Sequence, residues 1–416
     1  MTGRNRLQLA KASLAMLIVA ATAAACSSSP TATTSTIPAP AGLPSFYSVP
    51  TSLPSTKPGT LLKSQLVSAA GIHGRVYRVL YVSESVHGTP TVVSGLVMVP
   101  SAPLPAGGFP VVTWGHGTNG MADQCAPSLT PANDVPLQNQ LLDQGWVVAS
   151  SDYEGEGTPG LLPYIVGVVA ARNTIDIVRA ADQLTAAHAS KSYVVWGHSE
   201  GGQTAMFALA LANAYAPELD LKGVVAGAPP SQFQAIYAFL KTSPFRYYLF
   251  MAAGGFNAAY GNAAAPLAQV LTAKGISLIP VLNQGCSDYV AKHTSGYSLA
   301  AIVKADPFTV PAWKKLLIAN DPGSLSTSSS APLLMIQGGA DEQIPVATTA
   351  LLEQHECSIG QVVQRWVYPG QSHAGVIAVS MPDMVHWIAD RFSGVTSPDP
   401  YQPVAQSGIA VSDCAS

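Results

Sequence analysis

A five-residue motif around Ser199 has the composition and the setting of a catalytic nucleophile. Residues 197–201 read Gly-His-Ser-Glu-Gly and fit the pattern G-x-S-x-G. An apolar stretch, 193–196, comes directly before the motif, and a helical pattern begins at Gln203. A serine in a sharp turn between a strand and a helix exposes its hydroxyl, and the helix N-terminus favours negative charge beside it. We therefore predict that Ser199 attacks a carbonyl carbon.

A serine hydroxyl needs a base, and in this strand–turn–helix arrangement the acid and then the histidine follow the serine along the chain. His373 lies in a loop directly after a predicted strand at 364–368, which is where an open α/β sheet holds such groups. We predict that His373 is the base. The other histidines after the serine, which fall in helical or non-alternating segments, are His293, His355 and His386.

The acid that orients the base is expected on a neighbouring strand end. Residues 333–337 form an apolar strand pattern, and Asp341 lies in the loop that leaves it. Its carboxylate would accept the imidazole Nδ1–H and stabilise the imidazolium. The adjacent Glu342 is the alternative, whereas Asp306 and Asp321 lie in or near a segment without strands.

Attack on a carbonyl creates a negatively charged oxygen, which two backbone N–H groups can stabilise. The residue after the nucleophile, Glu200, is expected to supply one of them. Residues 115–118 read Gly-His-Gly-Thr, and we assign the second donor to Thr118, with Gly117 as the neighbouring alternative. We expect a structural role for the side chain of His116 and a solvated position for that of Glu200.

Short apolar strands alternate with helical patterns over most of the chain. Two alternating segments, 75–86 and 91–100, predict an antiparallel hairpin. Further strands are predicted at 110–114, 145–151, 193–196, 223–226, 333–337 and 364–368, and helices at 172–187, 203–215 and from about Pro382 to 392. Such alternation is typical of a mostly parallel sheet covered on both faces, so the predicted fold class is α/β.

The alternation stops between residues 230 and 330. Helical patterns occur there at 233–240, 247–253, 266–273 and 312–319. We interpret this segment as a helical cap inserted late in the sheet. The predicted core then comprises residues 61–229 and 331–395, and residues 396–416 form a C-terminal tail.

Composition excludes several classes of protein. Charged residues make up 10% of the chain and the formal net charge is −3, so no basic field for nucleic acid is present. After residue 30 no apolar run reaches the roughly 18 residues that a membrane span needs. The cysteine and histidine spacing fits no metal site, and neither a metal nor an organic cofactor is expected.

The N-terminus has the pattern of an export signal. Basic residues precede an apolar run at 13–25, and Cys26 follows three alanines. The arrangement resembles a bacterial lipoprotein signal, in which the cysteine becomes the lipidated first residue, although Ala23 stands where leucine is usual. Ordinary cleavage near Ala25 is the alternative. Residues 26–60, rich in Ser, Thr and Pro, are predicted to form a tether.

Four further cysteines agree with export, because an even number permits two disulfides with three possible connectivities. These cysteines are Cys125, Cys286, Cys357 and Cys414.

Three motifs in combination resemble the secretory lipase family of α/β hydrolases. They are Gly-His-Ser-Glu-Gly-Gly-Gln at 197–203, Trp-Gly-His-Gly-Thr at 114–118 and Asp-Tyr-Glu-Gly at 152–155, and the resemblance covers about residues 45–395. It implies an α/β-hydrolase fold with a helical cap between the sixth and seventh strands. It also implies hydrolysis of carboxylic esters, often acylglycerols. The last motif would line the edge of the site and has no assigned chemical role.

The resemblance further implies specific residue roles. Ser199, Asp341 and His373 would form the catalytic triad. A Cys125–Cys286 disulfide would tie the core to the cap, and a Cys357–Cys414 disulfide would hold the tail.

The predicted protein is an exported serine hydrolase that cleaves lipid or other carboxylic esters through an acyl-enzyme on Ser199. Two alternatives remain: acyl transfer to an alcohol by the same triad, and a catalytically inactive binding lipoprotein on a hydrolase scaffold. The expected partners are the ester substrate and, through a lipid on Cys26, the membrane. A monomer is expected, anchored to the outer face of the cell membrane or secreted if the cysteine is not lipidated.

Overall fold

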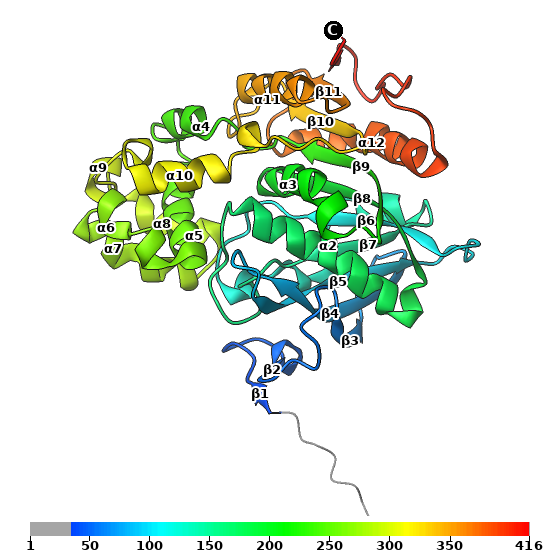
Figure 1. Cartoon of the computed structure of the whole chain (residues 1–416), viewed down its shortest axis with the longest axis horizontal. Coiled ribbons are helices and arrows are strands. Elements are labelled where there is room, and N and C mark those ends of the chain that lie inside the picture. Colours follow the sequence, from blue (N-terminus) through cyan, green and yellow to red (C-terminus); the bar gives the residue numbers. More distant parts are fainter. Residues whose placement is uncertain (1–34, 416) are drawn as a thin grey trace, which may run out of the picture.

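The computed structural model describes residues 35–415, and a ten-stranded sheet runs through its centre (Figure 1). The strands lie in the order β12-β11-β10-β9-β8-β6-β7-β5-β4-β3. Those from β7 to β11 in this row pair in parallel, whereas β3, β4 and β5 at one edge and β12 at the other pair antiparallel. Their bounds are β3 Leu61–Val67, β4 Gly74–Glu84, β5 Pro90–Pro100, β6 Phe109–Gly115, β7 Val147–Ser151, β8 Ala189–His198, β9 Asp220–Gly227, β10 Leu333–Gly338, β11 Val363–Tyr368 and β12 Ala410–Asp413.

Helices cover both faces of this sheet. Alternate residues of β10 show the two sides: Leu333 packs in one apolar cluster and Leu334 in the other. The first cluster includes α2 (Gly167–Gln183), α3 (Glu200–Tyr215) and α11 (Val346–Ser358), and the second includes α1 (Gln138–Leu142) and α12 (Gly375–Ser393). The predicted α/β class with a mostly parallel, doubly covered sheet is confirmed.

Every strand predicted from the pattern is present, but β3 and β12 were not predicted. Both are edge strands with largely exposed side chains, so their sequences lack a buried apolar run. Strand β3 pairs with β4, and β12 pairs with β11. The apolar signal therefore identifies only the strands that helices cover.

Between β9 and β10 the chain forms the helices of the predicted cap, which lie to one side of the sheet in Figure 1. No helix in the described part of the chain is both long and apolar enough to cross a membrane. The cap helices are α4 Phe233–Leu240, α5 Tyr247–Ala264, α6 Leu267–Val270, α7 Ala273–Leu278, α8 Ser287–Ser295, α9 Leu299–Ile302 and α10 Pro311–Ala319.

Several predicted helices have different bounds in the structure: α5 continues to Ala264 beyond its predicted end at residue 253, and α2 begins at Gly167 and ends at Gln183. The helix predicted at 266–273 is divided, because Thr272 caps the next helix by accepting the Gly275 N–H through its side chain. The last helix begins at Gly375 rather than near Pro382, which lies inside it. Burial of one face of α12 against the sheet compensates for the backbone hydrogen bond that the proline cannot donate.

The prediction of a tether over 26–60 is wrong from residue 35 onward. There the chain forms β1 (Thr36–Ile37) and β2 (Val49–Pro50), which pair with each other. Between them Phe46 and Tyr47 are buried, and the Tyr47 hydroxyl hydrogen-bonds Ser128 at 2.6 Å. Two aromatic side chains provide enough apolar surface to hold a Ser- and Pro-rich segment on the core. The predicted signal and Cys26 lie outside the described residues.

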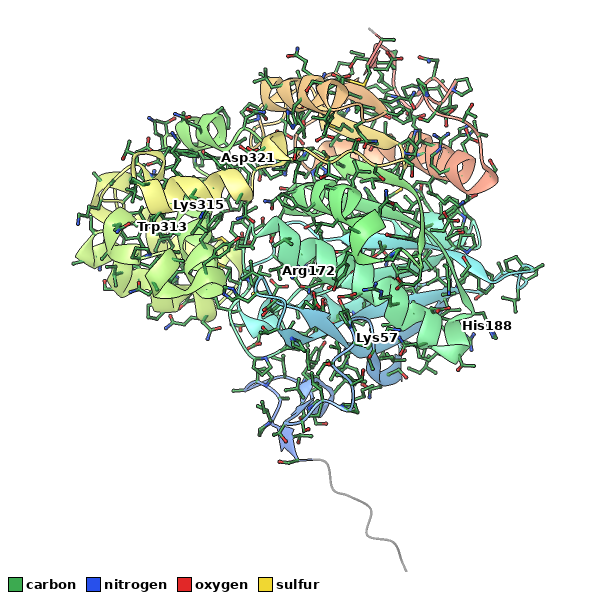
Figure 2. All side chains as sticks on the ribbon, viewed as in Figure 1. Lys57, Arg172, His188, Trp313, Lys315 and Asp321 are labelled. Atoms are coloured by element: carbon green, nitrogen blue, oxygen red, sulfur yellow. A yellow bond between two sulfur atoms is a disulfide. The ribbon has the colours of Figure 1, made fainter. Side chains whose placement is uncertain are left out.

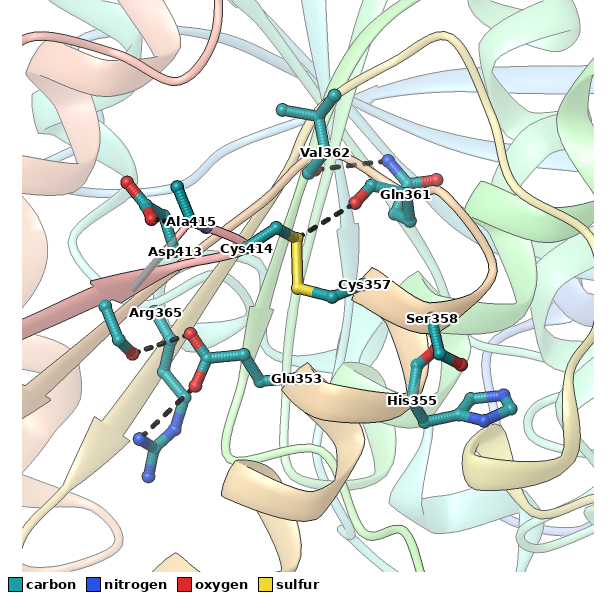
Figure 3. The surroundings of a disulfide bond; sticks show 11 residues. Glu353, His355, Cys357, Ser358, Gln361, Val362, Arg365, Asp413, Cys414 and Ala415 are labelled. Carbon is teal, nitrogen blue, oxygen red and sulfur yellow. Dashed lines mark hydrogen bonds and ion pairs between the residues drawn. A yellow bond between two sulfur atoms is a disulfide. The ribbon is translucent and has the colours of Figure 1, made fainter.

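The C-terminal tail is attached to the core by several contacts. The Cys357–Cys414 disulfide, implied by the family resemblance, is confirmed (Figure 3). Beside it Glu353 accepts a hydrogen bond of 2.6 Å from Ser412, and farther back Asp399 forms a buried ion pair with Arg391. The tail therefore completes one edge of the sheet.

Candidate active site

Ser199 occupies the turn between β8 and α3 with a strained backbone. Its φ of 61° and ψ of −122° are unfavourable for a residue with a Cβ atom, and its N–H donates to the Gly227 carbonyl at 2.8 Å. A Cβ on Gly197 or Gly201 would overlap backbone carbonyl oxygens, so both positions require glycine. The turn therefore has the geometry expected of a nucleophile elbow.

Asp341 and His373 meet at the same edge of the sheet. The loop after β10 carries the aspartate, the loop after β11 carries the histidine, and Oδ2 lies 2.8 Å from Nδ1. Burial would raise the pKa of Asp341, but hydrogen bonds from His373 and from the N–H groups of Gln343 and Ile344 outweigh it and keep that pKa below its ordinary value. A charged carboxylate opposite Nδ1 places the proton of a neutral imidazole there and leaves Nε2 as the base.

The ring of His373 lies beside that of His198, the residue that precedes the predicted nucleophile. The ring centroid of His198, which directly precedes Ser199, is 4.7 Å from that of His373. Burial and the nearby His373 lower the pKa of His198 to about 3, so His198 is neutral and does not compete for the proton.

Glu342 takes a different position from Asp341. Its side chain accepts a 3.0 Å hydrogen bond from the backbone N–H of His373 and does not reach the imidazole Nδ1. The other candidate histidines are also engaged away from this site. His293 bonds the Tyr289 carbonyl, His355 bonds the Leu325 carbonyl and His386 lies 3.4 Å from Asp390.

Both predicted oxyanion donors lie next to the nucleophile. A Cβ on Gly117 would be 3.7 Å from that of Ser199, so the loop after β6 passes directly beside the serine. The hydroxyl of Thr118 lies 2.9 Å from that of Tyr164, and its interaction with the Glu200 carboxyl group lowers the pKa of that group. The side chains of the two predicted donor residues therefore influence each other.

The expectation that the Glu200 side chain is solvated is wrong. It is 3% exposed, and its Oε2 has no hydrogen-bond partner among the described residues. Burial raises the pKa of Glu200 to about 8 against the opposing effect of Thr118. The neutral acid adds no negative charge where an oxyanion would form. A solvated carboxylate would be negatively charged at neutral pH and would repel the oxyanion.

His116 sets the orientation of the peptide between Gly117 and Thr118. Its Nδ1 lies 2.8 Å from the Gly117 carbonyl oxygen and its Nε2 lies 3.3 Å from that of Asp152; both oxygens can only accept, and the shorter contact places the single proton of the neutral ring on Nδ1. The carbonyl of Gly117 and the N–H of Thr118 belong to one planar trans peptide, so fixing the first fixes the direction of the second. The expected structural role of His116 is therefore to orient the N–H group of Thr118.

Asp152-Tyr153-Glu154-Gly155, which had no assigned role, contacts this loop, because the Asp152 carbonyl oxygen lies 3.3 Å from His116 Nε2. The Asp152 side chain accepts hydrogen bonds from Ser94 and from the N–H and hydroxyl of Ser128. The buried carboxyl of Glu156, which directly follows the motif, lies 3.6 Å from His116 Nε2, and burial raises its pKa well above the ordinary value. The motif itself was visible in the sequence, but the partners that its residues contact were not.

An apolar cavity of about 120 Å³ extends from Ser199 into the cap. Aromatic and aliphatic side chains form most of its wall, and among residues 35–415 Glu200 is the only carboxyl or basic group that lines it. Helices α4, α5 and α10 contribute Phe233, Tyr237, Phe256, Trp313 and Leu317. A hydrocarbon chain attached to a carbonyl at Ser199 fits such a wall.

The cap is joined to the loop that carries Thr118. The Cys125–Cys286 disulfide is confirmed, and beside it the Ser287 N–H donates to the Asn119 carbonyl at 2.8 Å. Within the cap itself, the carboxylate of Asp321 accepts hydrogen bonds from the N–H groups at the start of α4.

No cluster of acidic, histidine or cysteine side chains within residues 35–415 is suited to a metal ion.

A nucleophile elbow on a mostly parallel sheet, with an apolar cavity under a helical cap, defines an α/β hydrolase of the lipase and esterase class. The profile of the secretory lipase family matches residues 122–399, and the chain belongs to that family. The enzyme is therefore a carboxylic ester hydrolase.

Individual relatives support the same grouping. A secreted triacylglycerol lipase of Malassezia globosa is 27% identical over 360 residues, covering 80% of this chain and 75% of the relative. A protein of Mycobacterium tuberculosis described as a probable inactive lipase is 22% identical, covering 88% and 87%. The crystal structure of Candida antarctica lipase A has a TM-score of 0.74 at 20% identity and covers 87% of each chain, a similarity of fold.

Proposed function

We propose that the protein hydrolyses lipid esters through an acyl-enzyme on Ser199. His373 Nε2 removes the proton from the Ser199 hydroxyl, and Oγ bonds to the ester carbonyl carbon. The carbonyl oxygen becomes an oxyanion that the N–H groups of Thr118 and Glu200 stabilise. Collapse of this intermediate expels the alcohol, which takes the proton from the imidazolium. Water then repeats the sequence and releases the acid.

The 2.8 Å contact between Asp341 and His373, in loops at the carboxyl ends of β10 and β11, is the observation that carries this proposal, together with the strained turn of Ser199 at the carboxyl end of the parallel strand β8. It also supports activity over the inactive alternative, which the Mycobacterium tuberculosis relative makes relevant. All three triad positions are occupied by residues that can perform the chemistry, and the acid is ionised.

The substrate class follows from the cavity. Its apolar wall supports an acyl chain as the group bound in the cap, and the triacylglycerol lipase relative is consistent with that class. Ester turnover should be measured with p-nitrophenyl esters from acetate to palmitate, with Ser199→Ala as control. Equal rates for the two proteins would refute the mechanism, and a sharp fall beyond butyrate would refute the assignment of long-chain lipids.

We also propose that the chain is exported as a monomer and held at the cell membrane by a lipid on Cys26. The order of a basic segment, an apolar run and a cysteine supports this proposal. Mass spectrometry of the mature N-terminus tests it: a diacylglyceryl group on Cys26 is expected, and an unmodified N-terminus near this position would indicate ordinary secretion.

A further inference from the structure

Basic side chains are concentrated in the cap. Residues 230–330 contain seven Lys or Arg against three Asp, whereas the rest of the chain contains 13 basic and 20 acidic residues. Among the described residues no basic side chain of the cap forms an ion pair. Five basic side chains of the core do form one, namely Arg172, Arg179, Lys222, Arg365 and Arg391. The positive charge of the cap is therefore not neutralised within the molecule.

Helix α10 presents two different faces. Trp313 and Leu317 face inward and line the apolar cavity. Lys314, Lys315 and Ile318 line a separate surface groove, and Ile318 is 46% exposed. Figure 2 shows Trp313 and Lys315 on this helix at the side of the molecule that the cap forms. One short helix thus joins the wall of the cavity to a basic, partly apolar surface.

Phe308 connects the groove with the cavity, because its side chain lines both. It lies in a short turn, Pro307–Thr309, whose preceding Asp306 accepts the Phe308 N–H at 2.9 Å. Asp306 is the acidic residue nearest in sequence to the residues that line the groove. One of its carboxylate oxygens is engaged by this hydrogen bond from Phe308. A lipid headgroup held beside the two lysines would have its hydrocarbon chain at the residue that borders the cavity.

We propose that the surface formed by Phe308, Pro311, Lys314, Lys315 and Ile318 docks on an anionic lipid surface. The lysines bind phosphate or carboxylate headgroups while their methylene stems and Ile318 contact the hydrocarbon boundary. The inference rests on the proposed function in one respect: docking delivers an ester past Phe308 toward Ser199. Vesicle binding itself does not require catalysis.

Co-sedimentation with vesicles tests the proposal. The mature chain, which lacks residues 1–25, is produced with Cys26→Ser, so that neither the signal segment nor an acyl anchor contributes, and is mixed with phosphatidylcholine vesicles or with equimolar phosphatidylcholine and phosphatidylglycerol. The variant Lys314→Gln/Lys315→Gln removes the two docking charges. The control Lys57→Gln/Lys191→Gln removes the same charge from exposed positions outside the cap, and Figure 2 labels Lys57.

We expect a preference for the anionic vesicles that weakens with salt, and a partition coefficient about 30-fold lower in the Lys314/Lys315 variant. The control pair should change it by about twofold or less. Ile318→Ser should weaken binding to both kinds of vesicle. Equal losses in the two lysine pairs, or equal binding to neutral and anionic vesicles, would overturn the proposal.

A further control separates docking from catalysis. Ser199→Ala protein should bind vesicles as the protein with Ser199 does, whereas p-nitrophenyl butyrate turnover by the protein with Ser199 reports separately on the proposed function.

Discussion

The imidazole of His116 stacks on the phenol ring of Tyr153, with ring centroids 4.1 Å apart and ring planes 27° apart. The Tyr153 hydroxyl donates toward the His116 carbonyl at 3.3 Å and lies 3.1 Å from the Thr204 hydroxyl on α3. One buried tyrosine therefore holds the loop at 115–118, the proposed oxyanion loop, against α3, which begins directly after Ser199. Its own φ of 65° shows that the chain adopts an unfavourable backbone to place it there.

Replacing His116 by Phe should lower kcat by about 10- to 100-fold while KM changes by about twofold or less. The phenyl ring keeps the stack on Tyr153 but cannot donate to Gly117, so the Thr118 N–H loses its fixed direction. The affinity for a trifluoromethyl ketone inhibitor should fall in parallel. His293→Phe is the matched control, because His293 also stacks on a tyrosine and bonds a carbonyl. An unchanged kcat in His116→Phe would contradict the positioning role.

Replacing Asp341 should lower kcat far more than replacing the neighbouring Glu342. Asp341→Asn keeps the shape but removes the charge opposite Nδ1, and we expect kcat to fall by about 10³- to 10⁴-fold. Glu342→Gln retains a side-chain oxygen for the His373 N–H and should cost about threefold or less. Steady-state rates on p-nitrophenyl butyrate decide the matter, and a larger loss for Glu342→Gln would reverse the assignment.

Ionisation of Glu200 should limit activity at high pH. Its pKa of about 8 means that the side chain is neutral below that pH and negative above it, beside the developing oxyanion. We therefore expect kcat/KM of the parent to decline above pH 8, and Glu200→Gln to lose this decline. Glu342→Gln should retain it. A decline that persists unchanged in Glu200→Gln would show that another group is responsible.

The buried acids should make the fold more stable at mildly acidic pH than at alkaline pH. Burial raises the pKa of Asp134 to about 8, with repulsion from Asp152 acting in the same direction. A raised folded-state pKa means that the native chain binds more protons, so its contribution to stability is full below the unfolded pKa near 4 and is lost as pH rises to about 8. In Asp134→Asn we expect the difference in unfolding free energy between about pH 5 and pH 9 to shrink by about 1–3 kcal/mol. Thermal unfolding across this range measures it, and an unchanged pH dependence would contradict the assignment.

The sequence allowed the positions of the candidate triad to be predicted because each residue follows an apolar strand. Asp341 and His373 come directly after β10 and β11, and parallel strands bring such loops to one edge. The burial of the Glu200 and His116 side chains could not be predicted from the positions of the strands. Their burial depends on Tyr153, Tyr164 and the cap, which come together only in the folded chain.

The same distinction explains the errors at the two ends of the described chain. Composition around Phe46 predicted a tether, but two aromatic residues are sufficient for docking when Ser128 supplies a partner. Strand β12 has no buried run of its own, and pairing with β11 together with the Cys357–Cys414 bond places it. Both features depend on contacts distant in sequence, which local patterns do not contain.

The Cys125–Cys286 bond links residues 161 positions apart and lies next to the loop that carries Thr118. Cysteine pairs form disulfides in oxidising compartments, whereas in the cytoplasm they remain as reduced thiols. A newly made chain would therefore lack the bond that fixes its cap against the oxyanion loop, and we expect reduced protein to turn over esters more slowly than oxidised protein. The timing of catalytic maturation would then follow the route of the chain: an enzyme able to attack lipids becomes fully competent only after it has left the compartment where it was synthesised.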